Sequence, residues 1–231
     1  MNEFYLTNLL KKLIEFLYKV KRNKFIILFL IKPFNTWIVS IFYDESKAIK
    51  DADIWKNERY YKSEFYKELE SPIQKYYIEY IEHNTSKKDK ILDICCNQGR
   101  HLKGLHNLGY QYLYGVDIMD DAINLLKESK EYSEGGILAE SDMAQLYIKK
   151  QHEKFFDYAI TYSATIELIN PGFKIFEELY RILKKGFIFV LNENGHSYPR
   201  FYRYQIKSSG FKIKNITKLS KSLNLYHCVR I

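Results

Sequence analysis

The sequence predicts an α/β fold: a doubly wound, seven-stranded, mostly parallel sheet with a C-terminal antiparallel hairpin, preceded by an N-terminal helical extension. From about residue 88, short apolar runs alternate with stretches of helical periodicity, which is typical of parallel strands joined by helices. The last two apolar runs are separated only by LSKS at 219–222. This connection is too short for a crossover helix, so the two final strands should pair antiparallel.

Seven apolar runs supply the predicted strands, at 90–95, 111–118, 136–140, 155–162, 186–193, 211–218 and 223–231. The clearest helical patterns between them are 120–132 and 171–185. In the second pattern, apolar residues recur at intervals of three and four and therefore share one helical face. Asp120 and Asp121 suit the positive end of the first helix, and Gly186 is expected to end the second.

Residues 1–87 are expected to form a helical extension or cap, and residues 88–231 the core. Residues 4–20 place leucines on one helical face with lysines opposite, and a second helical pattern runs from about 72 to 83. The first of these helices is interpreted as packing its apolar face on the core. A basic amphipathic helix that lies on a membrane or on a partner remains the alternative.

The longest apolar stretch, at 25–43, is the nearest match to a membrane span. Lys32, Pro33 and Asn35 interrupt it, and its clean part is far shorter than the roughly 20 residues that a spanning helix needs. A transmembrane helix is therefore disfavoured, while peripheral membrane contact through residues 1–43 stays open.

The composition, with 46% apolar residues, supports one folded core in a chain of 231 residues. The net charge of +8 favours polyanion partners, but only seven of the 36 basic residues are arginine, which indicates a compositional bias toward lysine. Three cysteines cannot build a disulfide framework, and the N-terminus does not resemble a cleavable signal. The protein is therefore expected to be cytoplasmic, with reduced thiols.

The segment ILDICCNQGR at 91–100 lies where the first strand ends and a helix begins. In an open parallel sheet this edge faces the ligand, and the following helix offers free N–H groups there. Gly99 allows the sharp turn that such a loop needs. Cys95 and Cys96 are adjacent, so their side chains should diverge, and a metal or disulfide site is disfavoured.

Acidic residues follow the next two strands. Asp117 ends the second strand 18 residues after Gly99, where a carboxylate can accept both hydroxyls of a ribose. Asp142 and Met143 follow the third strand, where a carboxylate can hold an adenine amino group and a thioether can lie on the ring. Together with the loop at 91–100, these positions predict a nucleotide-type cofactor site.

In this order the motifs resemble those of the class I S-adenosylmethionine-dependent methyltransferases. That family has an acidic residue and a G-C-G/N-x-G loop where this chain has Asp93 and the run from Cys95 to Gly99, so Cys95 replaces the first loop glycine. The later motifs of the family resemble the segments 115–123, 140–146, 155–168 and 176–193. The resemblance covers residues 88–231 and implies a Rossmann-like methyltransferase fold that binds S-adenosyl-L-methionine. The terminal hairpin also separates that fold from the nicotinamide dehydrogenases.

The resemblance implies a set of cofactor-binding residues. The loop after the first strand would hold the amino-acid end of the cofactor, Asp117 its ribose, and Asp142 with Met143 its adenine. Tyr60 and Tyr61, before the core, would close over the methionine moiety. The complete set is Asp93, Cys95, Asn97, Gly99, Asp117, Ile118, Asp142, Met143, Tyr162, Tyr60 and Tyr61.

Glu167 and His196 are the candidate catalytic residues. A hydroxyl acceptor needs a general base because its own pKa lies far above neutrality, whereas an amine acceptor needs neither residue. The resembling family often has Glu-His after the fourth strand, but this chain has Glu167-Leu168, so a histidine base is absent there. The five other histidines are interpreted as surface or packing residues.

The leading interpretation is a methyltransferase that acts on a hydroxyl or amine of a small molecule or saccharide. An RNA or protein acceptor is the alternative, although no nucleic-acid-binding module is visible in the sequence. The fourth-strand region reads TYSAT at 161–165, unlike the Asn/Asp-Pro-Pro-Tyr loop of DNA amino-methylating enzymes. A non-catalytic binding or scaffold protein, docked through its amphipathic N-terminus, is the alternative from another class.

Overall fold

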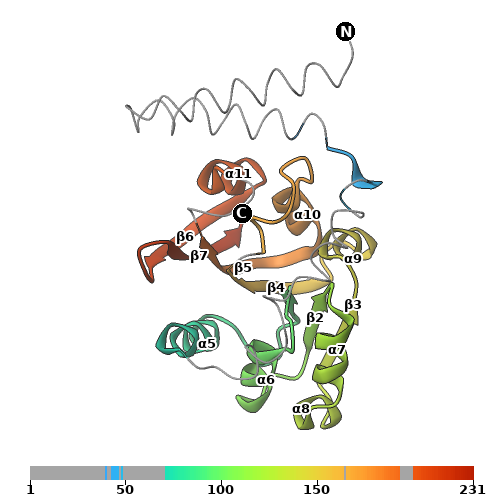
Figure 1. The fold of residues 1–231 in the computed structure, drawn as a ribbon. Helices are drawn as coiled ribbons and strands as arrows, with labels where there is room; N and C mark the ends of the chain where they lie inside the picture. The colour runs from blue at the N-terminus through green and yellow to red at the C-terminus, as the bar shows by residue number, and fades with distance from the viewer. Residues whose placement is uncertain (1–39, 41–42, 47, 49–70, 164, 193–199) are drawn as a thin grey trace.

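The structure is a computed structural model that describes residues 40, 43–46, 48, 71–163, 165–192 and 200–231. In these ranges the strands form one sheet in the order β3-β2-β1-β4-β5-β7-β6 (Figure 1). The pairs among β1 to β5 are parallel, whereas β7 pairs antiparallel with both β5 and β6. The strands are β1 Ile91–Ile94, β2 Leu113–Asp117, β3 Ile137–Ser141, β4 Phe156–Tyr162, β5 Leu183–Asn192, β6 Phe211–Lys218 and β7 Leu223–Arg230. The predicted fold class is confirmed.

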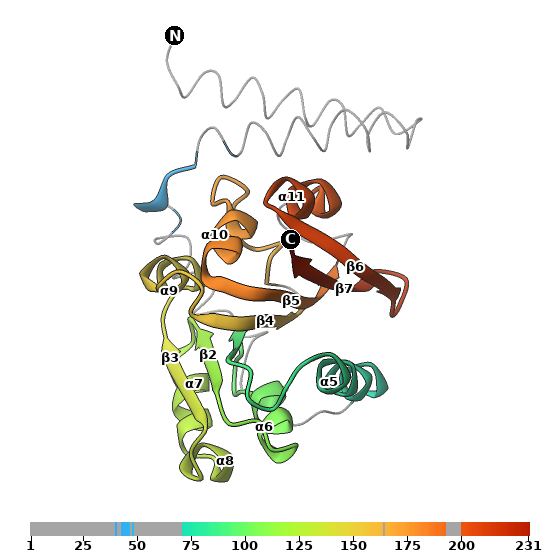
Figure 2. The same ribbon diagram turned by 180° about the vertical axis from the view of Figure 1, so that it is seen from behind.

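Helices cover both faces of this sheet. Those described are α5 Pro72–Asn84, α6 Arg100–Asn107, α7 Asp120–Lys127, α8 Lys130–Ser133, α9 Ala144–Lys150, α10 Ile175–Ile182 and α11 Tyr202–Ser208. Helices α5, α6 and α7 pack on one face, and α9, α10 and α11 on the other, as the opposite views of Figures 1 and 2 show. The described core is therefore a three-layered sandwich of helices, sheet and helices.

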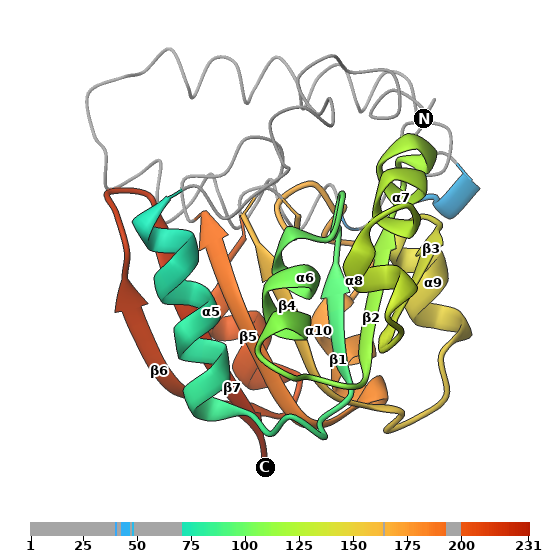
Figure 3. The same ribbon diagram turned by 90° about the horizontal axis from the view of Figure 1, so that it is seen from below.

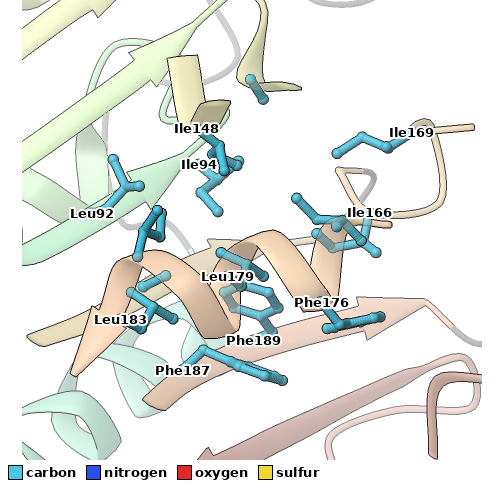
Figure 4. Close-up of a cluster of buried hydrophobic side chains, with 14 of the residues drawn as sticks. Leu92, Ile94, Ile148, Ile166, Ile169, Phe176, Leu179, Leu183, Phe187 and Phe189 are labelled. Carbon is cyan, nitrogen blue, oxygen red and sulfur yellow. The ribbon is translucent and has the colours of Figure 1, made fainter. Parts of the chain in front are cut away.

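The alternation of side chains along β5 divides its residues between the two faces of the sheet. Phe187 and Phe189 point toward α10, where the Phe176 ring lies 5.7 Å from the Phe187 ring (Figure 4). Ile188 and Val190 point to the opposite face and pack with residues of α5 and α6. Every one of these residues is buried, which explains why β5 reads as a continuous apolar run in the sequence.

Helix α5 is anchored to the sheet through Tyr77, which is fully buried. The Tyr77 hydroxyl lies 2.6 Å from the Ile188 carbonyl oxygen and 3.0 Å from the Thr161 carbonyl oxygen. The helix begins with a capping box, in which the Ser71 hydroxyl accepts from the Gln74 N–H and the Gln74 side chain accepts from the Ser71 N–H. The predicted helix at about 72–83 is confirmed.

Gly186 does not end a helix, and the prediction that it would do so is wrong. Helix α10 stops at Ile182, and β5 begins at Leu183. Gly186 lies inside β5, where an added Cβ would overlap the carbonyl oxygen of Cys228 on β7. The glycine therefore permits close approach of two strands rather than a left-handed helix end.

The helical pattern predicted over 120–132 is split into α7 and α8. Ser129 causes the break, because its hydroxyl accepts from the Tyr132 N–H and begins a new helix. Asp120 and Asp121 lie in the first turn of α7 as expected, and the residue at its N-cap is Met119, which makes no side-chain capping hydrogen bond.

Most of the predicted extension, including residues 4–20, lies outside the described residues, and its boundary at residue 87 stays a prediction. Within the described ranges, no helix has both the length and the apolar character that crossing a membrane requires.

Candidate functional site

The predicted site residues that follow β1 to β4 in the described ranges converge at one edge of the sheet. Because β1, β2, β3 and β4 are parallel, their carboxyl ends meet at this edge, and Figure 3 shows the arrows of β1 and β5 pointing to the same side. Asp93 pairs in register with Gly115, and Asp117 with Ser141. The residues after β1, β2, β3 and β4 are thus brought together as predicted.

The loop after β1 is built from three residues in the left-handed conformation. The φ angles are +58° at Cys95, +50° at Asn97 and +68° at Gly99. Two backbone hydrogen bonds fix the loop, from the Cys96 N–H to the Val116 carbonyl at 3.0 Å and from the Gly99 N–H to the Cys96 carbonyl at 2.9 Å. Cys95 therefore adopts the backbone conformation that a glycine takes without strain, although it carries a Cβ.

Gly99 and Cys96 close the underside of this loop. Gly99 precedes α6 directly, and an added Cβ there would lie 2.7 Å from the Leu126 side chain on α7. Cys96 is buried beneath the loop, with its Sγ so near Gly115 that a Cβ on that glycine would approach it to 2.8 Å. Cys96 is thus a small packing residue.

Asp117 is the anchor of the loop. Its Oδ2 accepts from the Asn97 N–H at 2.8 Å, and its Oδ1 accepts from the Met119 N–H at 2.9 Å. Burial raises the pKa of Asp117, and these two backbone hydrogen bonds act against that shift by stabilising the carboxylate. Each oxygen keeps a further lone pair, so the carboxylate can still accept from hydroxyl groups of a ligand.

Asp142 has partners that the sequence did not predict. Its Oδ2 pairs with Lys150 Nζ at 2.7 Å, and its Oδ1 accepts from the Met143 N–H at 2.8 Å. Lys150 belongs to α9 and is exposed, and the Asp142 hydrogen bond raises its pKa. Met143 is buried at the start of α9. The carboxylate expected at the adenine is therefore held by a lysine of the following helix.

The segment after β4 carries Glu167, which is fully buried. The Thr161 hydroxyl lies 2.8 Å from both the Ile94 carbonyl oxygen and the Thr165 hydroxyl, which ties this segment to the end of β1. Glu167 follows Thr165 by two residues and therefore lies in the part of the chain that this hydrogen bond ties to β1.

Tyr162 and Ile118 are half-buried residues at the ends of β4 and β2. The guanidinium of Arg100 lies over the Tyr162 ring at 5.6 Å from its centroid. Tyr60, Tyr61 and His196 lie outside the described residues, and their assignments stay predictions.

His101 is the residue at this edge that the sequence reasoning missed as a candidate. It lies in the first turn of α6 and is buried, with Nδ1 3.8 Å from Oδ2 of Asp93. Its position in the first turn after the loop was the available signal, because that turn must face the end of β1. Within the described ranges, no cluster of three or more His, Cys, Asp or Glu residues is arranged to hold a metal ion.

The chain is similar to one known protein family and to several solved structures. Residues 91–186 match the family model described as Methyltransferase domain (Methyltransf_25). The PH0226 protein from Pyrococcus horikoshii OT3 is 18% identical, with a TM-score of 0.58 over 78% of this chain and 99% of its own.

Two further solved structures share the fold. A SAM dependent methyltransferase from Aquifex aeolicus is 14% identical, with a TM-score of 0.55 over 82% of this chain and 100% of its own. An S-adenosylmethionine dependent methyltransferase from Mesorhizobium loti is 14% identical, with a TM-score of 0.55 over 70% of this chain and 100% of its own. The search of curated proteins found no match.

Proposed function

Residues 91–186 form a class I S-adenosylmethionine-dependent methyltransferase domain, and from this premise we propose that the protein methylates a hydroxyl or amine of a small molecule or saccharide. The observation that carries the cofactor site is the left-handed loop from Cys95 to Gly99, held by Asp117. The loop brings the N-terminal turn of α6 and the Asp117 carboxylate to one place, so N–H groups and a hydroxyl acceptor lie where an amino acid joined to a ribose requires them.

The residues present fit S-adenosylmethionine. Asp93 is buried, and within the described residues its Oδ2 has no hydrogen-bond partner, so it suits the ammonium group of the amino-acid end. Asp117 would hold the ribose hydroxyls, and Asp142 with Met143 the adenine. The bound cofactor supplies a methyl group on a positively charged sulfur.

The chain's own contribution to methyl transfer is chiefly position. Much of the acceleration in such a displacement comes from holding the acceptor in line with the methyl group and keeping water out. The Thr161 hydroxyl bonds the Ile94 carbonyl and the Thr165 hydroxyl, which holds these residues together beside the loop. For a hydroxyl acceptor we assign the role of general base to Glu167 or His196.

A polar acceptor is supported by Ser163, which follows β4 directly. Ser163 is half-buried and has a φ of +54°, whereas the hydroxyls of Thr161 and Thr165 are buried and bond each other. Left-handed backbone at a non-glycine residue is commonest where function requires it. Hydroxyl side chains suit a hydroxylated or amino-bearing small molecule, because each can donate and accept.

The segment near residues 43–48 supports docking of the N-terminal extension on the core. Glu45 pairs with Lys149 of α9, and Tyr43 packs against the buried cluster under α10. Gly172 lies against the Tyr43 side chain and leaves no room for a Cβ of its own. We therefore propose that residues 1–87 form a cap on a methyltransferase core at 88–231.

A screen of acceptors with methyl-labelled S-adenosylmethionine tests the proposal. We expect label to transfer to a hydroxylated or amino-bearing small molecule or to a saccharide. Transfer only to RNA or protein would contradict the acceptor class. Binding of the cofactor without transfer to any acceptor would favour a non-catalytic scaffold.

A further inference from the structure

Asp93 and His101 are two buried polar side chains that face each other without a hydrogen bond. Asp93 is 1% exposed and His101 is 4% exposed. In the described part of the chain, Oδ2 of Asp93 and Nε2 of His101 have no hydrogen-bond partner. The distance from His101 Nδ1 to Asp93 Oδ2 is 3.8 Å, which is longer than a normal N–H···O hydrogen bond. Buried polar groups are rarely left in this state unless a site requires it.

Two aromatic rings hold the imidazole of His101 beside Asp93. The Tyr77 ring meets it edge-on at 5.4 Å between centroids, and the Tyr162 ring lies 5.3 Å away. Tyr77 is itself fixed, because its hydroxyl contacts the Ile188 and Thr161 carbonyl oxygens. With both rings in place, the imidazole has little freedom to turn away from Asp93.

The chemistry of the pair is complementary. Burial raises the pKa of Asp93, and His101 acts against this shift. Burial lowers the pKa of His101, which favours a neutral imidazole with one N–H to donate. A neutral donor next to a buried carboxylate favours its ionised form without cancelling the charge. That charge is then available for a cation.

We propose that His101 is a positioning residue for the cofactor: its Nδ1–H donates to Oδ2 of Asp93 and orients that carboxylate toward the ammonium group of S-adenosylmethionine. This inference rests on the proposed function. The contact must shorten by about 0.8 Å from its 3.8 Å to reach ordinary hydrogen-bond length, a shift within reach of small side-chain rotations.

Calorimetric binding of two ligands to the whole protein tests the inference. S-adenosylmethionine carries the ammonium group, whereas 5′-methylthioadenosine has the same adenosine and sulfur but lacks the amino-acid end. His101→Phe keeps a ring between Tyr77 and Tyr162 but removes the donor. His101→Asn keeps a donor, and His152→Phe is the matched control at an exposed histidine.

His101→Phe should weaken binding of S-adenosylmethionine about tenfold, the effect expected for losing a charge-assisted hydrogen bond. Binding of 5′-methylthioadenosine should stay within about twofold of wild type, and His101→Asn should restore most of the affinity for the full cofactor. In an Asp93→Ala background, His101→Phe should have no further effect.

Equal weakening of both ligands by His101→Phe would show a merely structural role and would overturn the inference, as would unchanged affinity for both. If the wild-type protein bound neither ligand, the proposed function itself would fall, and the inference with it. The two failures are therefore distinguishable.

Discussion

Cys95→Gly should stabilise the protein. Cys95 has a φ of +58°, a left-handed conformation that is strained for a residue with a Cβ. Cys95 is exposed, so replacing its side chain by that of glycine removes little buried contact area. Glycine adopts this conformation without strain, and it is the residue that the resembling family carries at this position.

The expected change in the free energy of unfolding of Cys95→Gly is the difference between two opposing effects. Relief of left-handed strain contributes about 1–2 kcal/mol. The greater freedom of glycine in the unfolded chain costs about 0.5–1 kcal/mol. The difference is a net gain of about 0.5–1 kcal/mol, which corresponds to a rise in Tm of about 1–4 °C for a chain of this size.

Urea and thermal unfolding of the wild type, Cys95→Gly and Asn97→Gly provide the assay. Asn97 is the matched comparison, because asparagine tolerates its φ of +50° and its Oδ1 accepts from the Gln98 N–H at 2.8 Å. Asn97→Gly should therefore lose stability while Cys95→Gly gains it. A loss in Cys95→Gly as large as that in Asn97→Gly would refute the assignment of strain to Cys95.

Three further predictions test other parts of the structure. Gly186→Ala should destabilise the fold by about 1–3 kcal/mol in urea unfolding, because its Cβ meets the Cys228 carbonyl; a neutral effect would contradict that close approach. Burial lowers the pKa of His227 to about 4, so the unfolded chain binds the proton first and unfolding free energy should fall as pH drops from about 6.5 to 4. His227→Gln should lose that part of the pH dependence, and an unchanged slope would exclude His227 as its source. Lys150→Met should weaken cofactor binding about two- to fivefold in calorimetry by freeing Asp142, and an effect above about tenfold would mean that Lys150 contacts the ligand itself.

The fold was predictable because its signals are local. Short apolar runs, helical periodicity and the four-residue connection before β7 are all properties of neighbouring residues. Gly186 was not predictable, because its reason is the approach of β7, which lies about 40 residues later in the sequence. The same sequence, a charged helix followed by glycine, suits a helix end equally well.

The positions of the main site residues could also be predicted from the sequence. Asp117 and the loop from Cys95 to Gly99 follow directly from strand ends, so their convergence could be inferred from a parallel sheet. The side chains that contact these site residues could not be inferred from the sequence. The Lys150–Asp142 ion pair and the approach of His101 to Asp93 depend on how α9 and α6 pack, which no local pattern encodes.

Calorimetric titration of the wild type, Asp117→Ala and the exposed control Asp121→Ala with S-adenosylmethionine tests whether Asp117 holds the cofactor. One cofactor should bind per chain in the wild type and in Asp121→Ala. The affinity should be at least about tenfold lower in Asp117→Ala, because a charge-assisted hydrogen bond contributes about 1.5–3 kcal/mol. Absence of binding to the wild type, or unchanged affinity in Asp117→Ala, would contradict a cofactor site built on Asp117.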